Sequence, residues 1–366
     1  MSGSAFGNIF RISTWGESHG KALGAVIDGC PAGLLLCEED IQTFLDRRKP
    51  GQSKYVTQRK ESDKVEILSG VFEGRTTGTP ISLIVRNESQ RSADYSDIAN
   101  YYRPGHADYT FDEKYGFRDY RGGGRSSGRE TIGRVAAGAV ASKILKQLGI
   151  EVYAYASAIG GIELDNNNFS LAERDNNPFA MPDAKAAQKI KEYADRKLEE
   201  CNSMGGIIEC VVGNMPAGIG DPVFDKLDAN LAKAVMSIGA VKGVEIGDGF
   251  KAAQSTGLDN NDAFRMQDGR VVKKTNHSGG ILGGISDGSD IILRAAIKPT
   301  PSIASVQQTV NKHGEEIDIS IHGRHDPMIV PRAVVVVEAM TAITLVDMLF
   351  TGMTSRLDRI ADFYKS

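Results

Sequence analysis

The sequence predicts an α+β fold in which one order of strands and helices occurs twice. Each half of the chain contains segments with strand-like alternation of apolar residues, and each half also contains a long apolar helix pattern. Loops rich in glycine and basic residues occur in both halves of the 366-residue chain, which has 41 glycines. Since no Pro- or Ser-rich linker separates the halves, we expect a single domain over residues 1–366 with a pseudo-duplicated architecture.

The first half of the chain alternates strand and helix signals. Apolar alternation predicts strands at residues 7–14 and 22–28 and a hairpin at residues 65–85. Residues 38–48 predict an amphipathic helix, because acids occupy its first turn and arginines its last. A second helix is expected from about residue 130 to residue 148, where apolar residues recur at helical spacing.

A long polar stretch, residues 86–128, separates that hairpin from the second helix. It is rich in glycine and aromatic residues and shows little periodicity. Connections between elements are usually about 4–6 residues long, and structureless stretches beyond about 12–15 residues are usually functional or disordered. Its aromatic content counts against disorder. We therefore expect ordered loops that build a site.

The second half repeats the strand and helix signals. The longest apolar run contains Glu338 and Asp347, which favours a buried helix over a membrane span. The expected strands are 151–164, 206–215 and 290–297, and the expected helices are 183–201, 221–238, 302–312 and 332–350.

Composition excludes several classes of protein. The net charge of −4 argues against a general polyanion binder. The four cysteines form no CxxC pair, which favours reduced thiols in a cytoplasmic protein. The HxH, HxxxH and HExxH spacings are absent, so no metal site is predicted. The P-loop motif GxxxxGK[ST] is also absent. Ser126 and Ser127 lack an adjacent base in sequence, so a covalent serine mechanism is not predicted.

Residues 118–134, RDYRGGGRSSGRETIGR, predict an anion-binding site. Four arginines and a triple glycine precede the second predicted helix and a fifth arginine lies in its first turns, so backbone N–H groups at a helix N-terminus could approach a ligand. Residues 298–302, KPTPS, precede the predicted helix 302–312 and suggest a second such terminus. A plain helix cap by Thr300 or Ser302 is the structural interpretation of the same residues, and it is compatible with anion binding.

Four histidines lie in polar loops beside glycine or proline, which favours proton transfer over a role in the core. They are His19, His106, His277 and His325.

Basic residues could also bind a different partner. Residues 47–60 contain six basic residues and no acid, and together with residues 118–134 they permit a nucleic-acid-binding protein. A solvated basic surface is the simpler explanation of residues 47–60, and basic clusters report only the charge of a partner.

Eight motifs with unusual composition occur along the chain, namely GESHG (16–20), DRRKPGQS (46–53), RPGHADYT (103–110), DYRGGGRSSGRET (119–131), AVKGVEIGDGF (240–250), NHSGGILGGIS (276–286), KPTPSI (298–303) and GRHDP (323–327). In this order they resemble the chorismate synthase family, and the resemblance covers about residues 7–350. The resemblance implies a β-α-β sandwich with helices between two antiparallel sheets, and a homotetramer. It implies conversion of 5-enolpyruvylshikimate 3-phosphate to chorismate and phosphate by anti 1,4-elimination with reduced FMN.

The same resemblance assigns roles to individual residues. His19 would protonate the departing phosphate, His106 would maintain the protonation state of reduced flavin, and Asp326 would act with flavin N5 to remove the C6 proton. The implied substrate-binding residues are Arg48, Lys54, Arg103, Arg129 and Arg134. The implied FMN-binding residues are Arg125, Ser126, Ser127, Gly239, Ala240, Gly283, Lys298, Pro299, Thr300, Pro301, Ser302 and Arg324.

Three positions depart from the family pattern. Gly128 replaces a frequent alanine, Pro301 replaces a serine and removes one backbone N–H, and Lys54 replaces a frequent arginine. Two sources of reduced flavin are left open: reduction by NADPH on the enzyme, or an external supply of reduced FMN. The chain has no Rossmann fingerprint that would decide between them. A flavin-binding protein without lyase activity is the third interpretation. No membrane or nucleic-acid partner is expected.

Overall fold

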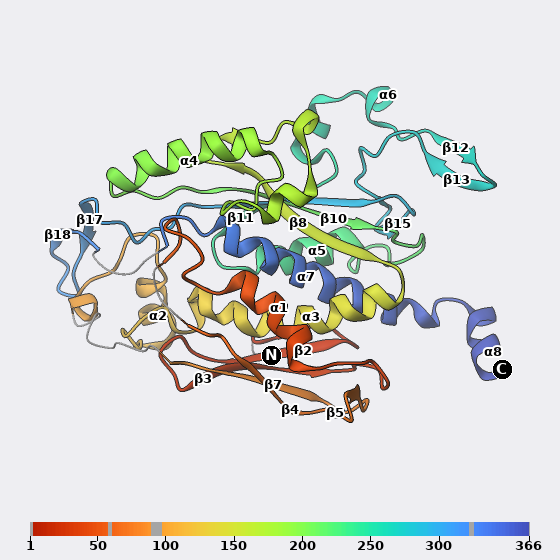
Figure 1. The fold of residues 1–366 in the computed structure, drawn as a ribbon, viewed down its shortest axis with the longest axis horizontal. Helices are drawn as coiled ribbons and strands as arrows, with labels where there is room; N and C mark the ends of the chain where they lie inside the picture. The colour runs from red at the N-terminus through yellow and green to blue at the C-terminus, as the bar shows by residue number, and fades with distance from the viewer. Residues whose placement is uncertain (1–2, 58–60, 89–96, 322–325, 366) are drawn as a thin grey trace.

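Two five-stranded antiparallel sheets enclose a layer of helices (Figure 1). The computed structural model describes residues 3–57, 61–88, 97–321 and 326–365. The first sheet has the order β1 (Ala5–Phe6), β2 (Arg11–Gly16), β3 (Ala22–Asp28), β7 (Ile81–Arg86) and β4 (Val65–Ser69). The second has the order β11 (Val241–Ile246), β16 (Ile291–Ile297), β10 (Gly206–Gly213), β8 (Glu151–Ile159) and β9 (Ile162–Glu163). This arrangement confirms the predicted sandwich.

Four helices fill the space between the sheets. They are α1 (Glu38–Arg48), α3 (Thr131–Gln147), α5 (Leu227–Met236) and α7 (Val330–Thr351). Helices α1 and α3 contact the first sheet, α5 and α7 contact the second, and α3 packs along α7. Helix α4 (Ala184–Glu199) lies on the outer side of the second sheet (Figure 1).

The two halves of the chain share one topology. The first half runs β2, β3, α1, β4, β7, α3, and the second runs β8, β10, α5, β11, β16, α7. The corresponding strands also occupy corresponding places, because the sheet orders β2-β3-β7-β4 and β8-β10-β16-β11 match strand for strand. Even the short hairpins before β7 and β16 correspond, namely β5 (Val71–Phe72) with β6 (Arg75–Thr76), and β14 (Ile281–Leu282) with β15 (Ile285–Ser286). The predicted pseudo-duplication is therefore present.

Helix α7 is buried on nearly all sides, as the apolar run predicted. Its two acids have partners: Glu338 accepts two hydrogen bonds from Arg47, and Asp347 accepts backbone N–H groups of residues 8–10. Among the described residues, the segment 330–354 alone is long and apolar enough to span a membrane, and most of it is buried inside the protein. It is therefore a core helix of the sandwich.

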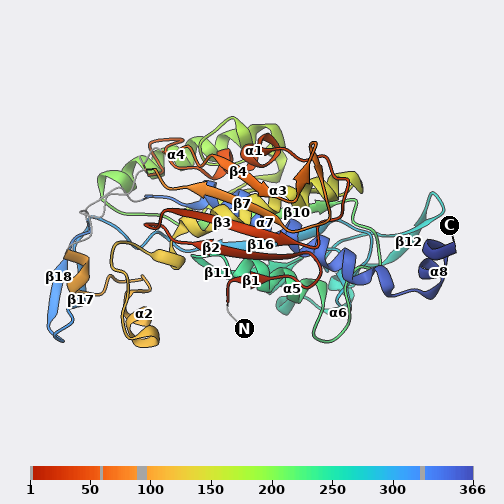
Figure 2. The ribbon, with the colours of Figure 1, turned by 90° about the horizontal axis from the view of Figure 1, so that it is seen from below.

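Shorter elements extend from the two ends of the sandwich (Figure 2). The hairpin of β17 (Gln307–Val310) and β18 (Glu316–Ile319) lies at the same end as α2 (Asp108–Tyr115). The opposite end carries the hairpin of β12 (Phe264–Gln267) and β13 (Arg270–Lys273), with α8 (Leu357–Lys365) beyond it; the four-residue α6 (Gly257–Asn260) precedes that hairpin in the chain.

Three sequence predictions about elements were wrong. The expected helix 302–312 is replaced by strand β17, because residues 307–310 pair with residues 316–319 around a turn with Gly314 at φ +81°. Helix α2 occurs inside the stretch expected to be loop; its low amphipathicity left no periodic signal. The expected helix 221–238 begins only at Leu227. The anion-friendly terminus expected at residue 302 is therefore not a helix N-terminus.

Close packing of α3 against α7 yields a test of the core. A Cβ atom added at Gly138 would lie 2.3 Å from Ala339 Cβ and 2.6 Å from Ala339 Cα. We expect Gly138→Ala to lower the free energy of unfolding by about 1–3 kcal/mol, because the helices must separate. Urea denaturation at fixed protein concentration measures the change. Gly257→Ala, where nothing lies within 4 Å, is the matched control; equal midpoints for the two variants would contradict this account of the contact.

Candidate active site

A cavity of about 580 Å³ lies where corresponding ends of the two halves meet. It is lined by the first turns of α3 and α7, by Arg48 at the end of α1, and by residues 237–240 directly after α5. Its remaining walls come from the β2–β3 turn and from the long connections β7–α3 and β16–α7. Two helix N-termini therefore face one cavity, and the second belongs to α7.

Most of the predicted site residues line this cavity, which we call the central pocket. They are His19, Arg48, Arg103, His106, Arg125, Ser126, Ser127, Arg129, Arg134, Gly239, Ala240, Lys298, Thr300, Pro301, Ser302 and Asp326. Pro299 faces a separate hollow beside Tyr193. Arg324 and His325 lie outside the described residues.

Three other predicted residues are not brought to the pocket. Lys54 is exposed and forms an ion pair with Asp195 on α4 at 2.7 Å. Gly283 lies in the β14–β15 hairpin, and neither residue is among those that line the central pocket. His277 forms a 2.7 Å contact with Asp248 and lies outside the pocket as well.

One buried carboxylate joins two of the pocket arginines. Asp63 accepts a 2.7 Å hydrogen bond from Arg48 Nη1 and a 3.1 Å bond from Arg129 Nη1. The Asp63 side chain is fully buried, and its backbone has φ +46°, a strained conformation for a residue other than glycine. Burial lowers the pKa of Arg48 to about 9, and the charge of Asp63 opposes that shift. Arg48 therefore stays cationic at neutral pH.

The other arginines of the pocket are also fixed by internal partners. Arg103 forms a two-bond pair with Asp108, at 2.7 Å for each bond. Burial raises the pKa of Asp108, but the hydrogen bonds and charge of Arg103 outweigh it, and the pKa is lowered. Arg134 donates to Glu130 at 2.8 Å, and Arg125 donates to the carbonyls of Thr14 and Gly16. The guanidinium groups are thus positioned before any ligand binds.

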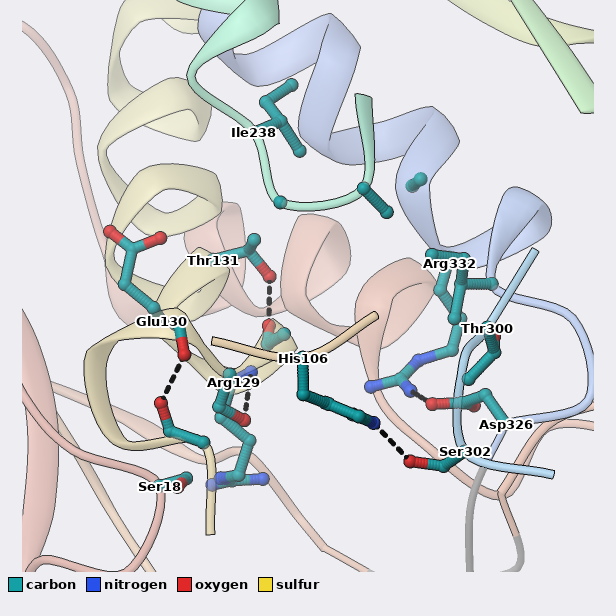
Figure 3. A pocket seen from close by; sticks show the side chains of 18 of the residues that line it. Ser18, His106, Arg129, Glu130, Thr131, Ile238, Thr300, Ser302, Asp326 and Arg332 are labelled. Atoms are coloured by element: carbon teal, nitrogen blue, oxygen red, sulfur yellow. Dashed lines mark hydrogen bonds and ion pairs between the residues drawn. The ribbon is translucent and has the colours of Figure 1, made fainter. Parts of the chain in front are cut away.

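The two pocket histidines lie in different surroundings. His19 is in the β2–β3 turn, where its Nδ1 is 3.1 Å from Ser18 Oγ. A Cβ at Gly122 would lie 2.4 Å from the His19 ring, so a glycine is required behind it. His106 Nε2 is 2.7 Å from Ser302 Oγ (Figure 3), which links the β7–α3 connection to the β16–α7 connection.

Asp326 has a partner that the sequence patterns did not reveal. One of its oxygens accepts Thr57 N–H at 2.8 Å, and the other accepts Arg332 Nη1 at 2.6 Å (Figure 3). Arg332 also donates to the carbonyl of Arg48 at 2.9 Å, at the C-terminus of α1. A signal for Arg332 existed: a cation in the first turn of a helix is unfavourable for the helix dipole unless an acid or a ligand compensates.

Two buried polar atoms of the pocket have no hydrogen-bond partner among the described residues. They are Arg129 Nη2 and Thr300 Oγ1. Only 8% of the Arg129 side chain is exposed, and an unsatisfied buried donor costs about 1–3 kcal/mol, more when it is charged. Both residues line the pocket and come from its two halves (Figure 3). A ligand rich in acceptor oxygens would supply the partners that these two buried donors lack.

The fold and the site together define a class of protein. The pocket concentrates arginines, places two histidines and a carboxylate among them, and is large enough for small molecules. Arg118 is buried against Asp112, and Arg121 pairs with Asp119, so these arginines do not form a surface for a polyanion. The class is an enzyme that acts on anionic small molecules.

Comparison with known proteins specifies the family. The family model of chorismate synthase matches residues 10–350. The chain is 72% identical over 365 residues to chorismate synthase of Lachnospira eligens, covering 100% of both, and 57% identical over 350 residues to that of Methanococcoides burtonii, covering 95% and 96%. A crystal structure of chorismate synthase matches with a TM-score of 0.76 at 33% identity, covering 98% of this chain and 97% of that chain.

The chain therefore belongs to the chorismate synthase family. It is a lyase that forms chorismate and phosphate from 5-enolpyruvylshikimate 3-phosphate, the last step of the shikimate pathway. The alternative of a nucleic-acid-binding protein is not supported by these similarities.

The double ion pair of Asp63 predicts a large loss of stability when its charge is removed. Asp63→Asn leaves two buried guanidinium groups without their shared anion, and loss of one partner of a buried pair costs about 3–5 kcal/mol. Urea denaturation would measure this decrease in unfolding free energy. The control is Glu66→Gln, which removes the exposed ion pair with Arg86 and should shift the midpoint far less. Similar shifts in both variants would contradict the role of Asp63.

Proposed function

We propose that the central pocket binds reduced FMN and the phosphorylated substrate together. The observation that carries this proposal is the pair of unsatisfied donors, Arg129 Nη2 and Thr300 Oγ1, which belong to opposite halves of one cationic pocket. FMN and the substrate both carry phosphate, and the substrate also carries two carboxylates. Such ligands supply the acceptor oxygens that these buried donors lack.

The residues present fit a phosphorylated flavin. Ser126 and Ser127 lie in the glycine-rich segment before α3, and Lys298 to Ser302 form the opposite wall, apart from Pro299. Lys298 donates to the carbonyl of Gly105 at 2.8 Å, and its pKa is lowered by burial and by the nearby Lys242. A bound anion would offset both causes. Arg125, Gly239, Ala240 and Arg324 complete the set proposed for FMN, with Gly283 included from the resemblance alone.

Substrate binding is assigned to the arginines of the same pocket. Arg129 donates through Nε to Asn87 and through Nη1 to Asp63, and its Nη2 has no partner among the described residues. A phosphate oxygen would supply that partner. Arg48, Arg103 and Arg134 would add positive potential and contact the carboxylates. Lys54 is also assigned to the substrate, on the resemblance alone.

The proton-transfer roles follow from position and chemistry. We propose that His19 donates a proton to the leaving phosphate, since an imidazolium has a pKa near working pH. Asp326, which accepts a hydrogen bond from Arg332, would take part with the flavin in removing the proton from C6. His106, which is held by a 2.7 Å contact with Ser302, would maintain the protonation state of the reduced flavin. Reduced FMN, when bound, would supply the electron density that makes the elimination possible.

The wider assignments are part of the same proposal. We propose a cytoplasmic homotetramer that interacts with neither membrane nor nucleic acid. NADPH is the proposed reductant of FMN if the enzyme reduces its own flavin, and a separate reductase would otherwise supply reduced FMN.

The direct test is anaerobic release of phosphate. The purified protein with chemically reduced FMN should release phosphate from 5-enolpyruvylshikimate 3-phosphate, and omission of either FMN or the reductant should abolish release. Phosphate is measured colorimetrically, and chorismate by its absorbance. Binding of FMN without any release of phosphate would instead support a flavin-binding protein that lacks lyase activity.

His106→Ala tests the assignment closest to the cofactor. Loss of a positioned acid or base should lower turnover by about 100-fold, while FMN still binds. Turnover is measured with saturating reduced FMN, and FMN binding by quenching of flavin fluorescence. His313→Ala, outside the pocket, is the control and should behave as wild type. Wild-type turnover in His106→Ala would remove His106 from its proposed role.

A further inference from the structure

Asn87 connects the His19 turn to Arg129. It follows directly after β7 (Ile81–Arg86), and its side chain is partly buried beside the pocket wall. Its Nδ2 donates to the carbonyl of Glu17 at 3.1 Å and to the carbonyl of Gly20 at 2.8 Å. Its Oδ1 accepts Arg129 Nε at 3.0 Å. One amide therefore uses its donor end on the turn and its acceptor end on the guanidinium.

The orientation of this amide is determined by its partners. Carbonyl oxygens can only accept, and a guanidinium can only donate, so the Asn87 amide satisfies all three contacts in one of its two orientations. The backbone N–H of Asn87 also donates to the carbonyl of Lys21 at 3.1 Å. The residue is thus tied to the start of β3 as well as to the turn.

The two carbonyls bound by Asn87 are the ends of the turn that carries His19. Gly20 N–H donates to the Glu17 carbonyl at 3.1 Å, which closes a four-residue turn with Ser18 and His19 as its central residues. Holding both ends of a turn fixes the direction of its central side chains. Arg129, at the other end of the amide, is itself bound to Asp63 through Nη1, and its Nη2 has no hydrogen-bond partner among the described residues.

We propose that Asn87 is a positioning residue that fixes the proton donor His19 relative to the phosphate-binding Arg129. The inference rests on the proposed function, in which both residues act on the leaving phosphate. Protonation and charge stabilisation then depend on one geometry, and displacement of a catalytic group by about 1 Å can cost about 100-fold in rate. Asn87 touches neither reactant in this scheme.

Two substitutions at this position distinguish the contribution of the contacts to the turn from that of the contact to the Arg129 guanidinium. Asn87→Ala removes all three side-chain contacts. Asn87→Asp retains an acceptor for Arg129 but places a carboxylate against two carbonyl oxygens, which displaces the turn. We expect both variants to lower kcat at least about tenfold, with Asn87→Asp no more active than Asn87→Ala, and with FMN affinity unchanged.

The matched control is Asn177→Asp. Asn177 also donates through Nδ2 to two carbonyls, those of Glu173 and Met181, but it lies in a loop outside the pocket. It should lose thermal stability without a change in kcat or in the KM for substrate. Wild-type kcat in both Asn87 variants, at a stability loss like that of Asn177→Asp, would show a structural role and overturn the inference.

Higher activity in Asn87→Asp than in Asn87→Ala would also overturn it, because contact with Arg129 alone would then explain the effect. Different results would show that the proposed function itself is wrong. In that case the wild-type protein releases no phosphate, or His19→Ala retains wild-type kcat.

Discussion

The cost of burying several guanidinium groups in one cavity is the constraint on which this structure depends. Arginine cannot escape burial by losing its charge, so each buried guanidinium needs a carboxylate or carbonyl partner. Asp63, Asp108, Glu130 and Asp326 supply those partners from four different segments of the chain. The internal pairs hold the cations in place, and anionic ligands would then need to balance only the positive charge that remains.

The duplicated topology explains why the pocket forms where it does. Helices α3 and α7 occupy equivalent places in the two halves, and their packing brings both N-termini to the same cavity. The connections that precede them, β7–α3 and β16–α7, are also equivalent, and they carry His106 and Asp326 respectively. The two equivalent connections thus form unlike walls of the pocket. The contact between His106 and Ser302 crosses from one connection to the other.

The sequence predicted the strands, the long helices and the duplicated order well, because apolar periodicity in these segments is strong. It failed at residues 302–312, where residues 307–310 form a hairpin with residues 316–319 instead of a helix, and at α2, whose low amphipathicity left no periodic signal. The sequence motifs predicted most of the residues that line the pocket. Asp63 and Asn87 were missed, because both have a partner far along the chain: Arg129 lies 66 positions from Asp63 and 42 positions from Asn87. Arg332 was missed although its place in the first turn of a helix was a signal. Lys54 is the opposite case: its basic sequence segment predicted a site residue, but the structure places it in an exposed ion pair with Asp195.

The central claim is that Arg129 Nη2 is the open donor around which the substrate phosphate binds, with His19 held beside it. The most direct measurement is an experimental structure of the protein with oxidised FMN and 5-enolpyruvylshikimate 3-phosphate. The account predicts a phosphate oxygen within hydrogen-bond distance of Arg129 Nη2, with the bonds from Arg129 to Asp63 and Asn87 retained. A phosphate bound elsewhere, with Arg129 Nη2 still without a partner, would contradict it.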